Sequence, residues 1–219
     1  MRINKKIQVA IADDHTLLRK ALARLIYSFE DYAVLFEADN GKEVKKNILS
    51  AGIPDIVLLD VNMPGMDGFE TVKWLFETYP QVKVLALSMF SDEKTIIKML
   101  RLGAKGYILK NIEPEELKQA LDSVMKKDFY LSEYISGKVI SGLHNGEGIP
   151  DEQEIVLNEK EKEFLRLICS DLSYKDIAVK MGIRIRNVED YRNSMFEKLK
   201  VKTRVSLAMF AIKHGFVQP

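Results

Sequence analysis

The feature that most constrains this chain is a set of apolar runs in which hydrophobic residues do not alternate with polar ones. The clearest run, DIVLLD at 55–60, ends at Asp60 and is followed by a turn rich in Pro and Gly. Strands with one face in water alternate, whereas continuous Val/Ile/Leu runs are typical of parallel strands covered on both faces. Similar runs occupy residues 7–12, 32–38, 82–88 and 106–110.

Helical patterns separate these runs. Leu18, Leu22 and Leu25 recur at the spacing of one helix face, and Pro114 stands where the first turn of a helix tolerates proline. Five β/α repeats within residues 1–127 predict an α/β doubly wound, five-stranded parallel sheet of the flavodoxin type.

The sequence changes character after residue 127. A stretch at 143–154 is rich in Gly, Pro and acidic residues without periodicity, which predicts a linker. The segment at 130–143 before it reads as a helix that could lie on either domain. We therefore assign residues 128–156 to a connecting helix and linker, and residues 157–219 to a second domain.

The second domain reads as helical throughout. Asn158 with Glu161 and Ser173 with Asp176 have capping-box spacing, and Gly182 ends a helix. A short helix, a tight Gly-containing turn and a second helix predict a small all-α helix-turn-helix domain.

Composition excludes several classes of protein. The chain is 47% hydrophobic and 30% charged, with a net charge of +1, so no overall field indicates a nucleic-acid or membrane partner. Its one cysteine, Cys169, allows no intramolecular disulfide, which favours a reducing compartment. No apolar run reaches the length of a membrane-spanning helix, and Asp13 and Asp14 end the first apolar stretch too early for a signal peptide. We expect a cytoplasmic protein with no membrane contact.

Polar residues follow four of the predicted strands, at the edge where ligands bind in doubly wound sheets. Each taken alone has an ordinary explanation, such as a helix cap for Asp14 or a solvated strand end for Lys110. Together, three carboxylates require a compensating cation, and oxygen ligands favour Mg²⁺. A lysine and a hydroxyl suit a phosphoryl group, and an aspartate can serve as its acceptor. The five residues are Asp13, Asp14, Asp60, Ser88 and Lys110.

These residues, with the whole segment DVNMPGMDG at 60–68, closely resemble the receiver domain of two-component response regulators. The resemblance covers the first domain and implies that Asp60 accepts a phosphoryl group from a sensor histidine kinase. It implies that Asp14, Asp60 and the backbone carbonyl of Asn62 hold Mg²⁺, while Asp13 assists through water.

The same resemblance assigns roles to three further side chains. Lys110 would pair with a phosphoryl oxygen, and Ser88 would be the switch hydroxyl that moves toward the phosphate. Tyr107 matches the switch aromatic that turns inward when Ser88 moves, although alone it reads as an ordinary strand aromatic. His15 reads as a first-turn helix residue rather than a ligand.

A phosphatase of the haloacid dehalogenase type also forms an aspartyl phosphate. It requires a second aspartate two residues after the nucleophile as a general acid, and this chain has Asn62 there. We therefore expect a persistent phosphoryl signal with slow autodephosphorylation, and not a turnover enzyme.

Residues 172–219 contain ten Lys or Arg and four Asp or Glu, grouped around the second helix of the predicted pair. Such a local basic excess indicates phosphate-backbone binding, although a solvated helical surface gives the same pattern. The stretch at 157–208 resembles the LuxR-type DNA-binding domain, so that the whole chain resembles the NarL/FixJ subfamily.

That resemblance implies that a helix near 185–199 enters the major groove of double-stranded DNA and that residues 204–214 form a dimerisation helix. The expected phosphate contacts are Lys175, Lys198, Lys202 and Arg204. The other expected DNA-facing residues are Arg186, Asn187, Glu189, Asp190, Arg192 and Asn193.

The chain departs from the family at the start of the recognition helix. Arg184 replaces the usual capping Ser, so a capping bond is expected to be missing. Glu189, Asp190 and Asn193 occupy base-facing positions, where acids can accept from cytosine and Asn can bond adenine. The alternative is that the two acids only pair with neighbouring Arg or Asn side chains on the helix.

We therefore expect a homodimeric transcription regulator controlled by phosphorylation. The alternative is a phosphorylation-controlled interaction protein in which the acid-bearing helix contacts another protein and DNA plays no part.

Overall fold

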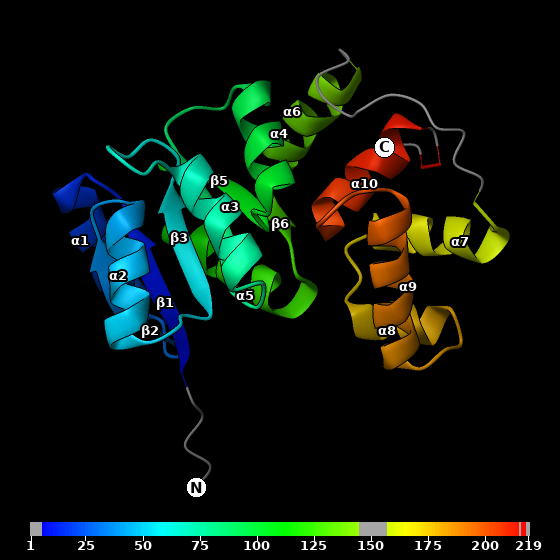
Figure 1. Cartoon of the computed structure of the whole chain (residues 1–219), viewed down its shortest axis with the longest axis horizontal. Helices are drawn as coiled ribbons and strands as arrows, with labels where there is room; N and C mark the ends of the chain where they lie inside the picture. Colours follow the sequence, from blue (N-terminus) through cyan, green and yellow to red (C-terminus); the bar gives the residue numbers. More distant parts are fainter. Residues whose placement is uncertain (1–5, 145–156, 215, 218–219) are drawn as a thin grey trace, which may run out of the picture.

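The computed structural model describes residues 6–144, 157–214 and 216–217, so most of the predicted linker, residues 145–154, lies outside the described residues. The N-terminal domain is built on one parallel sheet with strand order β2-β1-β3-β4-β5-β6 (Figure 1). The strands expected from the sequence are β1 (Ile7–Ala12), β2 (Tyr32–Ala38), β3 (Ile56–Asp60), β4 (Lys83–Ser88) and β5 (Gly106–Leu109).

The expectation of a five-stranded sheet was wrong by one strand. A sixth strand, β6 (Tyr130–Leu131), pairs in parallel with β5. Two residues are too short to produce a period in the sequence. The pairing depends on Gly106, because a Cβ there would lie 2.5 Å from the backbone oxygen of Tyr130. Residues assigned to the connecting segment thus extend the sheet.

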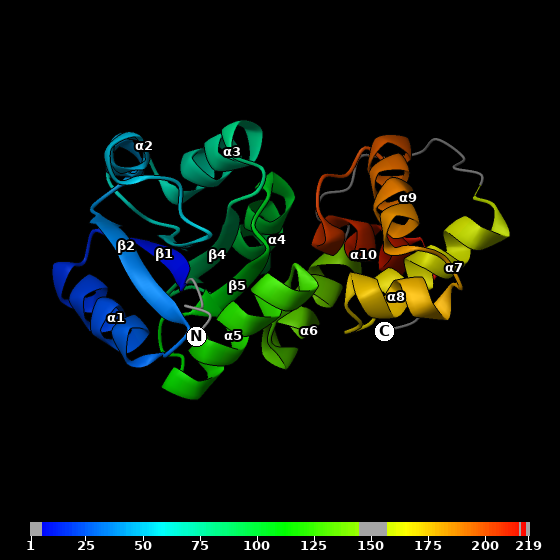
Figure 2. The same cartoon turned by 90° about the horizontal axis from the view of Figure 1, so that it is seen from below.

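Helices cover both faces of this sheet. Figure 2 shows α1 and α5 on one face and α2, α3 and α4 on the other. These helices are α1 (Thr16–Ser28), α2 (Gly41–Ala51), α3 (Gly68–Thr78), α4 (Glu93–Leu102) and α5 (Pro114–Lys127).

The central strand β3 shows why its sequence does not alternate. Val57 and Leu59 pack with α2, α3 and α4, whereas Ile56 and Leu58 pack with α1 and α5. All four side chains are fully buried. Both faces of the strand therefore require apolar residues, which confirms the doubly wound arrangement.

The C-terminal domain consists of α7 (Glu159–Ile168), α8 (Tyr174–Lys180), α9 (Ile185–Lys198) and α10 (Arg204–Lys213). Both expected capping boxes are present, at the starts of α7 and α8. Gly182 has φ +64° in the turn between α8 and α9, a conformation that glycine adopts without strain. Arg184 makes no side-chain cap at the start of α9, as expected.

The two domains are in contact through α6 (Glu133–His144), which lies beside both α4 and α10 (Figures 1 and 2). Ile135 and Val139 of α6 share one buried cluster with Val205 and Met209 of α10. Gly142 lies close against α4, since a Cβ there would lie 2.6 Å from Cδ1 of Ile97, the end of a side chain that can move. The connecting helix, which the sequence could place on either domain, thus contacts both. No helix among the described residues is long and apolar enough to cross a membrane.

Candidate functional site

The fold brings the predicted acid-site residues to one edge of the sheet. Asp13 follows β1, Asp60 ends β3, Ser88 ends β4 and Lys110 follows β5. These four strands are consecutive neighbours in the sheet, and all run in the same direction. The parallel topology, rather than closeness in the sequence, therefore assembles the site.

Lys110 connects the two buried carboxylates. Its Nζ lies 2.8 Å from Asp13 Oδ2 and 2.8 Å from Asp60 Oδ2, and its side chain is 4% exposed. Burial disfavours the ammonium charge, but hydrogen bonds to Asp13 and Asp60 outweigh it, so the pKa of Lys110 is raised. Lys110 is therefore a charged group held at the site, and not a solvated strand end.

The carboxyl of Asp60 is itself in an unfavourable environment for ionisation. Burial raises the pKa of Asp60, although the Lys110 ammonium and the Asn62 N–H act in the opposite direction. That N–H donates to Asp60 Oδ1 at 3.3 Å. The ligand role of the Asn62 carbonyl stays a prediction.

Gly68, at the start of α3, is a site residue whose role the sequence did not indicate beyond shaping a loop. A Cβ on Gly68 would lie 2.4 Å from the backbone oxygen of Asp60 and 2.7 Å from Cα of Val61. The glycine lets the start of α3 lie directly against the backbone that carries Asp60. The acceptor is thereby held by backbone contact as well as by strand pairing.

Ser88 and Tyr107 meet at a third residue. Ser88 is fully buried, and its Oγ accepts a hydrogen bond from the backbone N–H of Phe90 at 3.0 Å. Tyr107 is also fully buried, and its hydroxyl donates to the backbone oxygen of Phe90 at 2.8 Å. Burial raises the pKa of Tyr107 to about 12, so the hydroxyl stays protonated. Both predicted switch residues thus bind the same segment between β4 and α4.

The acidic cluster fits a divalent cation. Ligand atoms from Asp13, Asp14, His15 and Asp60 lie within 4.8 Å of one another. The buried oxygens Asp13 Oδ2 and Asp60 Oδ2 accept no hydrogen bond, apart from their contact with Lys110, in the part of the chain that the structure describes. Oxygen donors of this kind suit a hard cation such as Mg²⁺ better than a soft metal.

His15 takes the N-cap position of α1, one residue before the first turn. Its Nδ1 lies 2.9 Å from Asp14 Oδ1 and 3.3 Å from Asp13 Oδ1, while the side chain is 68% exposed. Its backbone N–H donates to Asp13 Oδ1 at 2.9 Å, which orients that carboxylate. The role that the structure shows for His15 is at the helix start.

Arg19 contacts the acid-bearing turn and was not predicted from the sequence. Its guanidinium donates to the backbone oxygen of Asp13. The sequence held no signal for it, since an Arg in an amphipathic helix ordinarily belongs to the solvated face.

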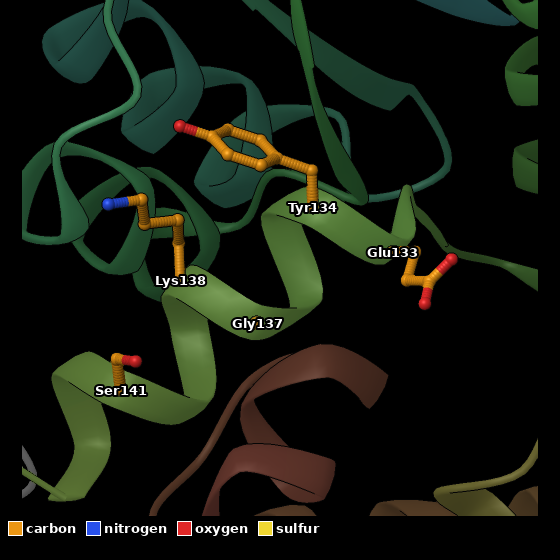
Figure 3. A pocket seen from close by; sticks show the side chains of 5 residues that line it. All are labelled: Glu133, Tyr134, Gly137, Lys138 and Ser141. Atoms are coloured by element: carbon orange, nitrogen blue, oxygen red, sulfur yellow. The ribbon is translucent and has the colours of Figure 1, made fainter.

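A shallow hollow lies on the outer side of α6, away from these acids. Figure 3 shows its lining side chains, among which Tyr134 and Lys138 project to the same side of the helix. Ser91, in the segment after β4, forms a 3.1 Å hydrogen bond with the Tyr134 hydroxyl. The hollow shares no residue with the acid site.

The exposed surface of α9 carries most of the predicted base-facing residues. Val188 and Met195 are buried, whereas Arg186, Asn187, Glu189, Asp190 and Asn193 are exposed. Among the described residues, neither acid forms an ion pair. The alternative in which they pair with neighbouring Arg or Asn side chains is therefore not seen.

Arg192 has other partners. Its Nε and Nη2 donate to Asn193 Oδ1 at 3.2 and 3.1 Å, and its guanidinium lies over the rings of Tyr174 and Phe196. The oxygen of Asn193 that would receive an adenine amino group is thus already occupied.

The predicted phosphate contacts divide into two groups. Lys175 is exposed on α8 and keeps the expected position. Lys198 and Lys202 are exposed as well, although Lys198 forms a 2.7 Å ion pair with Glu161 of α7 and the Lys202 ammonium lies 5.5 Å from the ring centroid of Phe76 in the N-terminal domain. Their roles as phosphate contacts stay predictions.

Arg204 does not present its charge at the surface, contrary to expectation. It is 1% exposed. Its guanidinium donates to the backbone oxygens of Ile168, Ser170 and Lys127, the last at 3.1 Å across the domain boundary, and lies over the ring of Phe129. A buried guanidinium needs such partners, and the domain contact supplies them. In this arrangement Arg204 cannot reach a phosphate.

Comparison with known proteins matches both halves of the chain. The receiver-domain model of response regulators matches residues 9–122, and the model for bacterial regulatory proteins of the luxR family matches residues 155–211. The nitrate/nitrite response regulator protein NarL of Escherichia coli strain K12 is 33% identical over 202 residues, covering 92% of this chain and 93% of NarL. The oxygen regulatory protein NreC of Staphylococcus haemolyticus is 31% identical, covering 94% of this chain and 97% of NreC.

Solved structures agree on the fold. The response regulator RcsB in its DNA complex is 23% identical to this chain, with a TM-score of 0.57. The match covers 97% of this chain and 100% of the RcsB chain. The relatives match nearly the whole length of the chain, and the receiver-domain model precedes the luxR-family model along it. These matches identify the family. The chain belongs to the NarL subfamily of two-component response regulators, transcription regulators that join a receiver domain to a LuxR-type DNA-binding domain.

Proposed function

We propose that this chain accepts a phosphoryl group on Asp60 from a sensor histidine kinase in the cytoplasm and binds double-stranded DNA as a phosphorylated homodimer. The observation that carries the proposal is the placement of Asp60. It is buried at the carboxyl edge of the sheet, 2.8 Å from the Lys110 ammonium and one strand away from Ser88.

In the proposed transfer, an Asp60 carboxylate oxygen attacks the phosphorus of a phosphorylated imidazole. The new O–P bond forms as the N–P bond breaks, and the electron pair of the N–P bond returns to the imidazole nitrogen. Asp14, Asp60 and the Asn62 carbonyl would hold Mg²⁺, with Asp13 assisting through water, and the ion would supply positive charge to the phosphoryl oxygens. Lys110 adds a second positive charge, and Ser88 a hydroxyl donor.

The residues around Asp60 favour a lasting phosphoryl group. Asn62 stands where a phosphatase of similar chemistry has its general acid, and an amide cannot donate a proton in that way. We therefore propose slow autodephosphorylation without turnover catalysis.

The domain contact indicates how phosphorylation would act on DNA binding. Val205 and Met209 of α10, the predicted dimerisation helix, are buried against the receiver domain. The same face cannot also pack against a second copy. We call the arrangement in which α10 packs against α4 and α6 the closed arrangement. Phosphorylation is proposed to shift the conformational equilibrium of the chain away from the closed arrangement and toward dimers.

Incubation with acetyl phosphate and Mg²⁺ tests the chemistry. Wild type should gain one phosphoryl group by intact mass, and Asp60→Asn should gain none. Glu30→Gln, a change at an exposed acid of the same domain, should label like wild type. If wild type gains no phosphoryl group, the proposal is wrong.

Glu189 and Asp190 of α9, which form no ion pair among the described residues, support a second candidate, a protein-interaction module that does not bind DNA. Retention of fragments from the source genome, measured across salt concentrations with phosphorylated chain, separates the two. A DNA-binding regulator should lose affinity steeply as salt rises. Lys175→Ala should reduce the slope of log affinity against log salt concentration by about one, the loss of one phosphate contact. If no fragment is retained with or without phosphorylation, the interaction module is the better reading.

A further inference from the structure

Arg19 of α1 is a buried charge whose role the phosphoacceptor chemistry does not use directly. The residue is 8% exposed. One guanidinium nitrogen donates to the backbone oxygen of Asp13, another lies 2.5 Å from Asp39 Oδ1, and the Nε lies 3.4 Å from Glu37 Oε2. The side chain therefore joins the carboxyl ends of β1 and β2.

Another arginine of the same helix shows that this arrangement is not a general property of α1. Arg24 is exposed and forms no ion pair within the described residues. Ion pairs at the surface contribute only about 0–1 kcal/mol, whereas a buried guanidinium is stable only when its donors are matched. Asp13 and Asp39 supply most of that match, whereas the Nε of Arg19, 3.4 Å from Glu37 Oε2, forms no hydrogen bond among the described residues.

The backbone that Arg19 holds is the segment that carries two predicted metal ligands. The Asp13 N–H donates to the backbone oxygen of Ala38 at 3.1 Å, and the Asp13 carboxylate accepts the N–H of His15. The hydrogen bond from Arg19 restrains the Asp13 carbonyl, and with it the plane of the peptide between Asp13 and Asp14. Together these bonds fix the direction in which Asp13 and Asp14 present their carboxylates.

Charge alone does not explain the arrangement. Asp39 and Glu37 lie against the guanidinium and offset its charge, so little net positive potential remains for the acids at the site. The planar guanidinium of Arg19 can donate hydrogen bonds in several directions at once, and this geometry is what restrains the turn after β1. A lysine would keep the charge but could not make these contacts together.

We infer that Arg19 is a positioning residue for the divalent-cation site, acting through the Asp13 backbone and not by contact with the cation. The inference rests on the proposed function, because it concerns the same site. It predicts that Mg²⁺ affinity depends on the shape of the Arg19 side chain more than on its charge.

Titration of the unphosphorylated full-length chain with MgCl₂ by calorimetry tests this directly. Arg19→Lys should bind Mg²⁺ about tenfold more weakly than wild type, the lower range for loss of a group that supports metal ligands. Arg24→Lys, the same change on the exposed side of the helix, should bind like wild type. In labelling with acetyl phosphate, Arg19→Lys should need correspondingly more Mg²⁺ for half-saturation while approaching the wild-type rate at saturation.

Asp39→Ala provides a second variant should Arg19→Lys fail to fold. It removes one anchor of the guanidinium at an exposed position and should weaken Mg²⁺ binding at least threefold. Binding within twofold of wild type in each folded variant overturns the role of Arg19, and the proposed function then still stands if wild type labels on Asp60. A wild-type chain that takes no label overturns the proposed function, and this inference with it.

Discussion

At the scale of single residues, the site is a balance between burial and charge. Asp60 is 2% exposed and faces the Lys110 ammonium, yet burial dominates and its pKa is raised. Such a carboxylate is held in place for chemistry at a cost in stability, as is common at functional sites. The stability of the fold therefore depends on this one side chain in a way that pH can reveal.

Asp60→Asn should be more stable than wild type at neutral pH. Because the folded pKa of Asp60 is raised, the folded chain binds more protons than the unfolded chain between the ordinary and raised values, and stability falls as pH rises through that window. Asn cannot ionise and avoids this loss. Each kcal/mol gained should raise the melting temperature by about 2–4 °C. The gain measured by calorimetry should narrow as pH is lowered, and an advantage that grows toward acid would contradict the assignment.

Gly68→Ala should destabilise the chain by about 2 kcal/mol or more, because the added methyl collides with the backbone at Asp60 and not with a movable side chain. Gly137→Ala is the matched control. A Cβ at Gly137 meets no atom within 4 Å, and alanine should stabilise α6 by about 0.5–1 kcal/mol. Urea unfolding of both variants checks the pair, and equal effects would rule out the close approach.

At the scale of elements, α6 connects the phosphoacceptor domain to the DNA-binding domain. One side of this helix carries Tyr134 (Figure 3). The Tyr134 hydroxyl forms a hydrogen bond with Ser91, in the segment bound by Ser88 and Tyr107. The other side buries Ile135 and Val139 in the cluster shared with α10. A movement of the Ser88 hydroxyl therefore has a short route of contacts to the DNA-binding domain.

Tyr134→Phe should loosen α6 without affecting phosphorylation. The lost hydrogen bond is exposed, so its contribution is about 0.5–1 kcal/mol, and amide exchange in α6 should quicken by about two- to fivefold. Ser141→Ala, on the exposed surface of the same helix, should leave exchange unchanged. Unaltered exchange in Tyr134→Phe would show that the bond does not hold the helix, and labelling of Asp60 should match wild type throughout.

At the scale of the whole molecule, the closed arrangement places α10 against α4 and α6 and leaves the outer face of α9 exposed. The contact includes the fully buried Arg204 and the apolar side chains of Val205 and Met209. The C-terminal domain retains a separate core, built around Phe164, Ile177 and Val188, which does not depend on the receiver domain. The contact can therefore open without unfolding either core.

Val139→Asp should open this contact from the receiver side and leave α10 unchanged. Val139 is 3% exposed, and a carboxylate there would be buried without a partner. In an Asp60→Asn background, which cannot be phosphorylated, Val139→Asp should retain more genomic DNA than Asp60→Asn alone and show a larger radius of gyration. Ser141→Asp, with the same new charge on the exposed face of α6, should change neither. If all three chains retain the same amount of DNA, the domain contact does not control DNA binding.

By itself, the sequence determined the features that arise from local pattern and from topology. Continuous apolar runs imply strands buried on both faces, and parallel strands bring Asp13, Asp60, Ser88 and Lys110 to one edge wherever the chain runs between them. The capping boxes of α7 and α8 were readable for the same reason, since their partners are three residues apart.

Only the tertiary structure decided the features that depend on contacts between distant residues. The strand β6, the burial of Arg19 and the pairing of Lys198 with Glu161 each require a partner whose position no local period encodes. Arg204 is the clearest case, because its bond to the Lys127 carbonyl spans 77 residues. A basic residue near a DNA-binding helix is equally compatible with a phosphate contact and with a buried domain contact. Which of the two it makes is set by whether packing supplies enough acceptors to offset the loss of water around its charge.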